Sequence, residues 1–429
     1  MLETIGEVGE MGREKKEITV LSLFSGCGGL DLGFEGDFEV LKDCLNKMVH
    51  PSWFRNERED ASWVRLPKTK FKVIFANDIM PAARHAWLPY FKRKGNNVVF
   101  RSESVVELVK RHKRGEKIFP KVDVVTGGFP CQDFSVAGKR KGFNSHKGHH
   151  GCLLTRDDEP TEENRGKLYM WMRHVIDITR PKVFIAENVK GLVSLADAKK
   201  IIENDFRSIG NGGYLVVNAK VLSAANFGVP QRRERVLFIG FRKDTLKSKI
   251  AELYSNGQIP DVFDPYPRAT HGTSKNNRVI PYVTVKQALT GLKEPEQTND
   301  LSQRAYSKAK WYGKHCQGQT EVNLKGLGPT IRSEHHGNIE FRRLDLDNGG
   351  KYVGEINRGM KQRRLTVREC ARLQTFPDDY EFVRSFSFNG DGYPLSASEG
   401  YKLIGNAVPP LLGFHLAWRL QELWTDVFK

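Results

Sequence analysis

One cysteine of this chain, Cys131, stands in a setting that could make it a nucleophile. It follows Pro130 in a tight loop, directly after a mainly apolar run at 122–125 and a pair of glycines at 127–128. Such a run is typical of a buried parallel strand, and open α/β sheets build their active sites at the carboxyl ends of these strands. A thiolate held there could attack an electrophilic carbon atom. The alternative is an inert buried cysteine in a turn, the usual state of a single Cys.

Acidic residues end two other apolar runs. Asp78 comes shortly after the run at 71–76, where a carboxylate could hold ribose hydroxyls or could simply cap a helix that begins near Pro81. Glu187 directly follows the run at 181–186. A carboxylic acid beside a nucleophile can donate or accept the proton that a reaction moves.

The elements that must position these residues alternate between strands and helices. Strands are predicted at 18–23, 71–76, 122–126, 181–186, 214–221 and 235–241, and helices at 104–114, 168–179 and 196–209. This alternation predicts an α/β domain with a mostly parallel, helix-covered sheet. The first strand ends in a glycine-rich turn at 24–29, which is typical of the first unit of a nucleotide-binding sheet, although it lacks the strict GxGxxG spacing.

Length and composition predict more than one domain. The 429 residues are 39% hydrophobic and 28% charged, and a chain of this length exceeds what one small core needs. We predict an N-terminal tail at 1–17, a catalytic domain at 18–241, a second, smaller and irregular domain at 242–395, and a return segment at 396–429 that completes the catalytic domain. Within the second domain, a helix is predicted at 365–373, with Thr366 as N-cap and Glu369 three residues later.

Charge and cysteine usage narrow the class of protein. The net charge of +17 favours a polyanionic partner such as DNA or RNA. Six cysteines without CxxC pairing indicate reduced thiols in the cytoplasm. The cluster of His146, His149, His150 and Cys152 lacks the spacing of a zinc site, so no metal is predicted. There is no apolar run of transmembrane length and no export signal.

Six segments, in this order, resemble the motifs of the DNA (cytosine-5) methyltransferases of bacterial restriction–modification systems. They lie at 23–29, 128–132, 187–189, 231–235, 364–377 and 405–410. The resemblance runs from about residue 19 to the C-terminus and leaves only the middle domain unmatched. It implies a Rossmann-like sheet that binds S-adenosyl-L-methionine, the methyl donor, and a second, smaller, irregular domain that recognises DNA.

The resemblance implies a mechanism that suits these residue types. The C5 atom of cytosine is a poor nucleophile, and addition of the Cys131 thiolate to C6 would activate it. Glu187, with a pKa raised by burial, would neutralise the electron density that builds toward N3. Arg233 and Arg235 would place cationic groups beside the site, one on the base carbonyl and the other on the adjacent phosphate or on Glu187. The alternative for both arginines is a surface salt-bridge network.

The resemblance also implies binding residues. Contacts to the cofactor are expected from Phe24, Ser25, Gly26, Gly28, Asp78, Ile79, Pro130, Leu168, Asn406 and Val408. Contacts to the flipped nucleotide and the DNA backbone are expected from Gln132, Ser135, Lys139, Arg140 and Gln231. Two features depart from the common pattern. Ser22 stands where an aspartate is frequent, and the register leaves open whether Glu103 or Ser104 faces the adenine amino group.

We therefore predict a sequence-specific DNA cytosine-5 methyltransferase that acts as a monomer on double-stranded DNA, without a membrane partner. It would be cytoplasmic, associated with the bacterial nucleoid through DNA, and it would share its target site with a cognate restriction endonuclease. One alternative is the same chemistry on tRNA, which a whole recognition domain disfavours. The other is a silent DNA-binding regulator, which the presence of Cys131 and Glu187 disfavours. The stretch at 35–70 could contact DNA, although its tryptophans favour packing.

Overall fold

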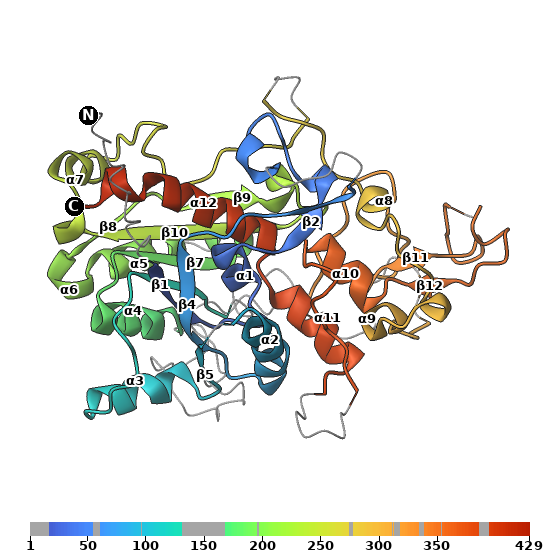
Figure 1. Cartoon of the computed structure of the whole chain (residues 1–429), viewed down its shortest axis with the longest axis horizontal. Helices are drawn as coiled ribbons and strands as arrows, with labels where there is room; N and C mark the ends of the chain where they lie inside the picture. Colours follow the sequence, from blue (N-terminus) through green and yellow to red (C-terminus); the bar gives the residue numbers. More distant parts are fainter. Residues whose placement is uncertain are drawn as a thin grey trace, which may run out of the picture.

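The computed structural model describes residues 17–54, 61–95, 97–130, 168–194, 197–273, 278–310, 312, 318–333, 339–352, 354–385 and 394–429. An eight-stranded sheet forms the centre of the larger domain (Figure 1). The strand order is β5 (Val99–Arg101), β4 (Phe71–Asn77), β1 (Ile18–Leu23), β6 (Val124–Gly128), β7 (Val183–Val189), β10 (Glu234–Arg242) and β8 (Tyr214–Val216), with β9 (Lys220–Ser223) also paired to β10.

The direction of the strands creates a switch point beside β1. Strands β5, β4, β1, β6 and β7 run parallel, and β10 runs antiparallel to β7, β8 and β9. The chain goes from β1 to β4 on one side and later returns to β6 on the other side of β1. In open α/β sheets, ligands bind at the carboxyl ends of the strands at such a point. The predicted α/β class and mostly parallel sheet are confirmed.

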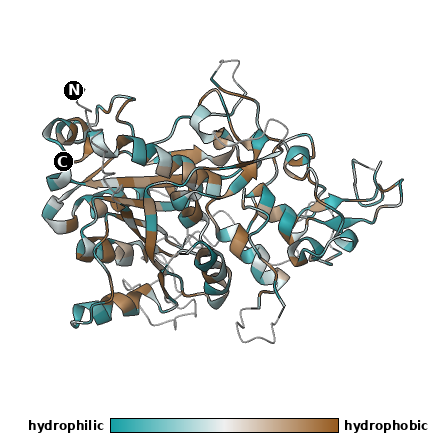
Figure 2. Cartoon of the chain, in the orientation of Figure 1, coloured by the Kyte–Doolittle hydropathy of each residue, from teal (hydrophilic) through white to brown (hydrophobic). Residues whose placement is uncertain are grey.

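Alternate residues of the central strands face two separate cores, because successive side chains of a strand point to opposite faces. Val20 belongs to one core, whereas Leu21 and Leu23 belong to the other. Figure 2 shows hydrophobic residues along the central strands and on the inner sides of the helices. The first core is covered by α1 (Gly29–Glu35), α2 (Pro81–Arg93) and α12 (Pro410–Val427). The second is covered by α3 (Val105–Lys113), α4 (Leu168–Thr179) and α5 (Ala198–Arg207), with the short α6 (Ile209–Gly212) beside them.

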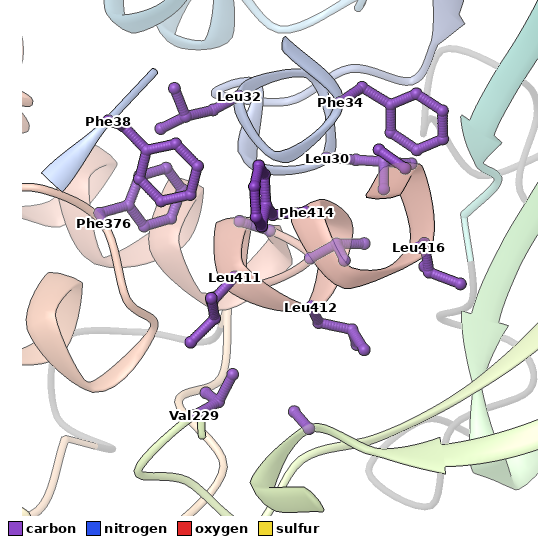
Figure 3. Close-up of a cluster of buried hydrophobic side chains, with 14 of the residues drawn as sticks. Leu30, Leu32, Phe34, Phe38, Val229, Phe376, Leu411, Leu412, Phe414 and Leu416 are labelled. Atoms are coloured by element: carbon purple, nitrogen blue, oxygen red, sulfur yellow. The ribbon is translucent and has the colours of Figure 1, made fainter. Parts of the chain in front are cut away.

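Helix α12 brings the end of the chain back onto α1. Figure 3 shows Phe414 of α12 pointing toward Leu30 and Leu32 of α1, whereas Leu411 of α12 points toward Val229. The two backbones approach closely at Gly33, where a Cβ atom would lie 2.4 Å from the carbonyl oxygen of Pro410. A glycine is required at this crossing, and the return segment is thereby fixed beside the start of the first helix.

The second domain, on the right of Figure 1, contains little regular structure. Its elements are α8 (Val285–Ala288), α9 (Leu301–Arg304), β11 (Phe341–Arg343), β12 (Arg363–Arg364) and α10 (Val367–Leu373). Helix α11 (Ala397–Asn406), which packs against α10, begins the return segment. Buried arginines hold its irregular segments together, because Arg343 lies 2.5 Å from Glu294, and Arg363 lies 2.8 Å from Glu369. The predicted helix is confirmed, including the Thr366 cap and the reciprocal bond from Glu369.

The segment after β10 differs from the prediction, which placed the second domain at 242–395. Residues just beyond β10 stay with the catalytic sheet, since Leu246 pairs with Phe428 and α7 (Ser248–Ser255) follows directly. The Tyr266 hydroxyl donates to the carbonyl of Leu237 in β10 at 2.9 Å. The second domain therefore begins later than 242. Low periodicity in this stretch hid its packing onto the sheet.

The stretch at 35–70 adds a hairpin of β2 (Glu39–Leu41) and β3 (Trp63–Arg65) to the catalytic domain. The packing role expected for its tryptophans is confirmed for Trp53, which is buried, stacks on the ring of His50 at a centroid distance of 3.8 Å and meets Phe414 edge to face. Among the described helices, none combines the length and the apolar character needed to cross a bilayer.

Candidate active site

The carboxyl ends of four neighbouring strands bring the predicted site residues to one edge of the sheet. Leu23 at the end of β1 pairs with Asn77 of β4 on one side and with Gly127 of β6 on the other. Gly128 of β6 pairs in turn with Glu187 of β7. The glycine-rich turn, Asp78, the start of the cysteine loop and Glu187 therefore lie side by side, as the parallel register requires.

The loop that carries the predicted nucleophile is fixed at its base. The Asn188 side chain donates to the carbonyl of Phe129 at 3.1 Å, and Pro130 next to it is half-buried. Asn188 thus anchors the chain two residues before Cys131. Several predicted residues lie outside the described residues, namely Cys131, Gln132, Ser135, Lys139, Arg140 and the cluster of His146, His149, His150 and Cys152.

Glu187 is a buried carboxyl group beside this loop. Its residue is 7% exposed, and burial raises its pKa, although the nearby Arg235 and Arg233 partly oppose this effect. The Arg235 Nε atom lies 2.6 Å from Glu187 Oε1. A Cβ atom at Gly128 would lie 2.8 Å from Glu187 Oε2, so only glycine leaves room for the carboxyl group. The site thus contains an acid whose proton affinity is raised and whose orientation is fixed.

Arg233 occupies a different position from the one expected at the base. It is 0% exposed, and its guanidinium donates to the carbonyls of Ile331 at 2.9 Å, Gly405 at 2.8 Å and Ala407 at 2.7 Å. These bonds join the second domain to the return segment. Arg233 therefore holds the second domain and the return segment together, and its contact with the base stays a prediction.

Gln231 likewise departs from its expected contact with DNA. The residue is 0% exposed. Its side-chain oxygen accepts from the backbone N–H of Ile331 at 3.0 Å, and its amide nitrogen donates to the carbonyl of Leu373 at 3.2 Å. Gln231 is therefore an internal bridge between domains. Burial alternates along the segment that leads into β10, since Gln231, Arg233 and Arg235 are buried whereas Arg232 and Glu234 between them are exposed.

The glycine-rich turn after β1 leaves space for a ligand and is tied to Asp78. Phe24 and Gly26 have positive φ angles of 51° and 54°, and a Cβ atom at Gly26 would meet no atom within 4 Å. Asp78 accepts from the backbone N–H groups of Gly26 and Met80, both at 2.8 Å. Burial raises the pKa of Asp78, and these two bonds lower it. A carboxylate has about four lone-pair positions, so acceptor capacity remains for ribose hydroxyls.

Apolar side chains flank this turn in a way that suits the faces of an adenine ring. Ile79, directly after Asp78, is 40% exposed. Phe24 is partly buried against the core that contains Leu168 and Phe129. Leu168 itself is buried in that core, so it lines no open surface.

Gly28 and Ser25 maintain the conformation of the turn and face away from its open side. A Cβ atom at Gly28 would lie 2.6 Å from the Trp87 ring, so Gly28 faces helix α2 and not the expected cofactor. Ser25 donates to Ser22 through its hydroxyl at 3.0 Å, and its hydroxyl accepts from the backbone N–H of Asn77 at 3.2 Å. Both residues hold the turn in place beneath the open surface.

The return segment closes over the same turn. A Cβ atom at Gly29 would lie 2.2 Å from the carbonyl oxygen of Val408, and the Tyr380 hydroxyl donates to the carbonyl of Cys27. Val408 is buried and Asn406 is exposed. Tyr380 was not among the predicted residues, because nothing in its local sequence indicates that it reaches a loop 353 positions away.

The end of β5 clarifies the register left open at 103–104. The Ser104 hydroxyl caps helix α3 by accepting from Val106 at 3.3 Å, so its side chain serves the helix. Glu103 is half-buried with Arg111 at 3.4 Å. Asn77, another residue that sequence reasoning missed, donates to the carbonyls of Arg101 and Glu103 and fixes this strand end. In the described ranges, no group of three His, Cys, Asp or Glu side chains could hold a metal ion.

Known proteins resemble this chain over nearly its whole length. A family model for C-5 cytosine-specific DNA methylases matches residues 18–422. The type II methyltransferase M.BspRI of Lysinibacillus sphaericus is 31% identical over 430 residues, covering 98% of this chain and 85% of its own. M.NgoFVII of Neisseria gonorrhoeae, also a type II methyltransferase, is 28% identical over 432 residues, covering 99% and 91%. The solved methyltransferase EhMeth of Entamoeba histolytica shares the fold with a TM-score of 0.54 at 14% identity, covering 96% and 99%.

The methyl donor of this family is S-adenosyl-L-methionine, and the turn described above fits it. The open space at Gly26 lets a ligand come close to the backbone. The remaining acceptor capacity of Asp78 suits the ribose hydroxyls, and the exposed side chain of Ile79 suits a face of the adenine ring. The position of the site at the carboxyl ends of the strands, the buried Glu187 acid and the match to the family model all indicate the same activity. The chain belongs to the C-5 cytosine-specific DNA methylase family and is a DNA cytosine-5 methyltransferase.

Proposed function

We propose that this enzyme is the modification methyltransferase of a type II restriction–modification system and methylates one cytosine within a short duplex DNA sequence. The observation that carries this proposal is the buried carboxyl of Glu187, held by Arg235 beside the base of the Cys131 loop. The similarity to two type II methyltransferases supports the biological setting. A cognate endonuclease that cuts the same site is the expected partner, and association with the nucleoid follows from DNA binding.

In the proposed chemistry, Cys131 and Glu187 act on opposite parts of the cytosine ring. The target base leaves the duplex, since its C5 and C6 atoms are shielded within it. The Cys131 sulfur forms a bond to C6, and the electron pair displaced from the C5–C6 double bond moves toward C5 and N3. Glu187, with its raised pKa, shares its proton with N3 and stabilises this charge. Once C5 carries the methyl group, its proton is lost to water, the sulfur–C6 bond breaks to re-form the C5–C6 double bond, the proton on N3 returns to Glu187, and the thiolate is restored.

When bound, S-adenosyl-L-methionine supplies an electrophilic methyl group. The residues proposed to hold it are Phe24, Gly26, Asp78, Ile79, Pro130, Asn406 and Val408. Ser25 and Gly28 maintain the shape of the turn, and Leu168 belongs to the core against which Phe24 packs. Ser135, Lys139 and Arg140 are proposed to grip the phosphates of the flipped nucleotide, with Gln132 beside the base. The second domain is proposed to read the sequence, and a monomer suffices because one chain supplies both domains.

Bisulfite sequencing of plasmid DNA from cells that express the chain tests this function. Protection of every cytosine at one position of a short recurring sequence is the expected result. The Cys131→Ser variant should abolish protection while DNA binding persists, and Glu187→Gln should slow methyl transfer by about 100-fold or more with little change in cofactor affinity. Protected cytosines in DNA from cells that express Cys131→Ser would refute the assignment of Cys131 as the nucleophile. Methylation of tRNA with none on DNA would transfer the same chemistry to RNA, and an unaltered phenotype of Cys131→Ala would indicate a regulator.

A further inference from the structure

The insertion at residues 35–70 has no part in the reaction described above. It lies between the glycine-rich turn and Asp78, and it is longer than a nucleotide-binding unit requires at this point. Between the strands of its β2–β3 hairpin lie two short helical turns, η1 (Lys42–Cys44) and η2 (Pro51–Phe54). The side chains of this insertion contact the catalytic domain on one side and the second domain on the other.

One side of the insertion is fixed to the catalytic domain. The buried Trp53 ring meets the ring of Phe414 in α12 edge to face, at a centroid distance of 4.8 Å. The Asn46 amide, also buried, donates to the carbonyls of Thr270 at 2.9 Å and Arg278 at 3.2 Å. The insertion is therefore held both on α12 and on the segment that leads to α8.

The other side of the insertion reaches the second domain at two points (Figure 1). The amide of Gln287 in α8 donates to Oδ2 of Asp43 at 3.1 Å. The guanidinium carbon of Arg372 in α10 lies 4.9 Å from the centre of the Trp63 ring, within the range of a cation–π interaction. The chain enters the second domain through α8 and leaves it after α10. The insertion thus contacts both places where this domain joins the rest of the chain.

Arg372 connects the Trp63 contact to other segments of the second domain. Its side chain is 5% exposed, and its guanidinium donates to Asp378 at 2.8 Å and to the carbonyl of Thr290, just after α8, at 2.7 Å. These bonds hold the planar guanidinium in one orientation over the Trp63 ring. A shift of α8 or α10 against the hairpin would break this arrangement.

We propose that the insertion is a brace that sets the angle between the second domain and the catalytic domain, with Asp43 and Trp63 as its positioning residues. The inference rests on the proposed function, in which the second domain reads DNA. Without these contacts the second domain samples other angles, and only a fraction of the molecules is ready to bind duplex DNA. The apparent Kd for DNA then rises by the inverse of that fraction, whereas the affinity for the cofactor does not change.

The charge of Asp43 distinguishes a brace from a direct contact with DNA. Phosphate groups repel a carboxylate, so removing an acid that faces DNA strengthens binding. Removing an acid that holds the second domain in place weakens binding instead. The two hypotheses therefore predict effects of opposite sign for Asp43→Ala.

Fluorescence anisotropy with the full chain, S-adenosyl-L-homocysteine and duplex DNA that contains the methylated sequence measures the effect. Asp43→Ala and Trp63→Ala should each raise the Kd for DNA about fivefold, and Trp63→Phe should stay within about twofold because it keeps an aromatic face for Arg372. The single-turnover rate at saturating DNA and the Kd for S-adenosyl-L-methionine should change by less than about twofold, since DNA binding selects the competent angle.

An exchange of side chains tests the contact between Asp43 and Gln287 itself. Gln287→Glu keeps the oxygen that caps α8 and places a second carboxylate beside Asp43, so the Kd for DNA should rise. Adding Asp43→Asn restores an amide–carboxylate pair and should return the Kd to within about twofold. Ile250→Val is the stability control, because it removes a buried methyl group in α7 and should lower the Tm without changing the Kd for DNA.

The outcomes separate the brace from the function on which it rests. If the unaltered chain does not methylate duplex DNA, the proposed function fails and the inference falls with it. If it does, unchanged Kd values for folded Trp63→Ala and Gln287→Glu refute the brace alone. Tighter DNA binding by Asp43→Ala, or an exchange that fails to recover affinity, would also overturn it. Should Trp63→Ala not fold, the solvent-exposed pair of Asp43 and Gln287 decides the question.

Discussion

Replacing Arg235 should destabilise the enzyme in a way that depends on pH. The Arg235–Glu187 pair joins Nε and Oε1 at 2.6 Å, and both side chains are 10% exposed. Removing one partner of a buried ion pair costs about 3–5 kcal/mol. Because Glu187 is slightly exposed and can take up a proton, we expect Arg235→Gln to lower the free energy of unfolding by about 2–3 kcal/mol at pH 8.

The sign of the pH dependence follows from the raised pKa of Glu187. The folded protein binds this proton more tightly than the unfolded chain, so the group favours folding below its unfolded pKa, and this contribution is lost as the pH rises through the folded pKa. Arg235 normally limits that loss by lowering the pKa. Without Arg235 the folded pKa rises further, so the cost of the substitution should fall to about 1 kcal/mol near pH 5.

Urea unfolding at several pH values between about 5 and 8 measures this effect. The double variant Glu187→Gln with Arg235→Gln should recover most of the loss at the upper pH, because no buried charge then remains unpaired. Arg242→Gln is the control, since it lies at the other end of β10 in a more exposed pair with Asp244 and should cost about 1 kcal/mol at every pH. If the two substitutions changed the free energy of unfolding additively, and if the loss caused by Arg235→Gln were the same at every pH, the proposed link between this ion pair and protonation of Glu187 would be refuted.

Three further substitutions test the geometry of the site. Gly128→Ala should lower kcat about 100-fold in single-turnover methyl transfer with little change in cofactor Kd, because its Cβ would lie 2.8 Å from Glu187 Oε2; a normal rate would contradict the crowding. Asp78→Asn should raise the cofactor Kd about tenfold by calorimetry, since an amide cannot accept on both sides, and an unchanged Kd would remove it from the site. Gly33→Ala should lower the free energy of unfolding by about 2 kcal/mol in urea, because its Cβ would lie 2.4 Å from Pro410 O; unaltered stability would show that α12 can shift.

Residues at strand ends were the most predictable part of this protein. Apolar runs locate the strands, and in a parallel sheet every carboxyl end lies at one edge. The adjacency of Asp78 and Glu187 to the cysteine loop follows from that rule and was available from the sequence. The expected raised pKa of Glu187 agrees with its burial, because a charged residue directly after a buried strand is partly covered by its neighbours.

Contacts between distant segments were not predictable in the same way. The motif that contains Gln231 and Arg233 is visible in the sequence, but their partner Ile331 lies about a hundred positions away in an irregular segment. Neither periodicity nor composition places that segment. The link between Trp87 and Asp31 spans 56 positions and is equally hidden. Such residues resemble site residues by type and become structural by burial, which only the fold determines.

The buried side chains leading into β10 connect the second domain, which we propose reads DNA, to the Glu187 acid. Gln231 and Arg233 both bind the backbone of Ile331 in the second domain, and Arg235, two residues further along, binds Glu187. A shift of the second domain relative to the sheet must therefore move the backbone that carries Arg235. A displacement of about 1 Å can cost 100-fold in rate. If the second domain binds DNA as we propose, a shift of that domain on binding would therefore change the position of Arg235 and, with it, the rate of the step that needs Glu187.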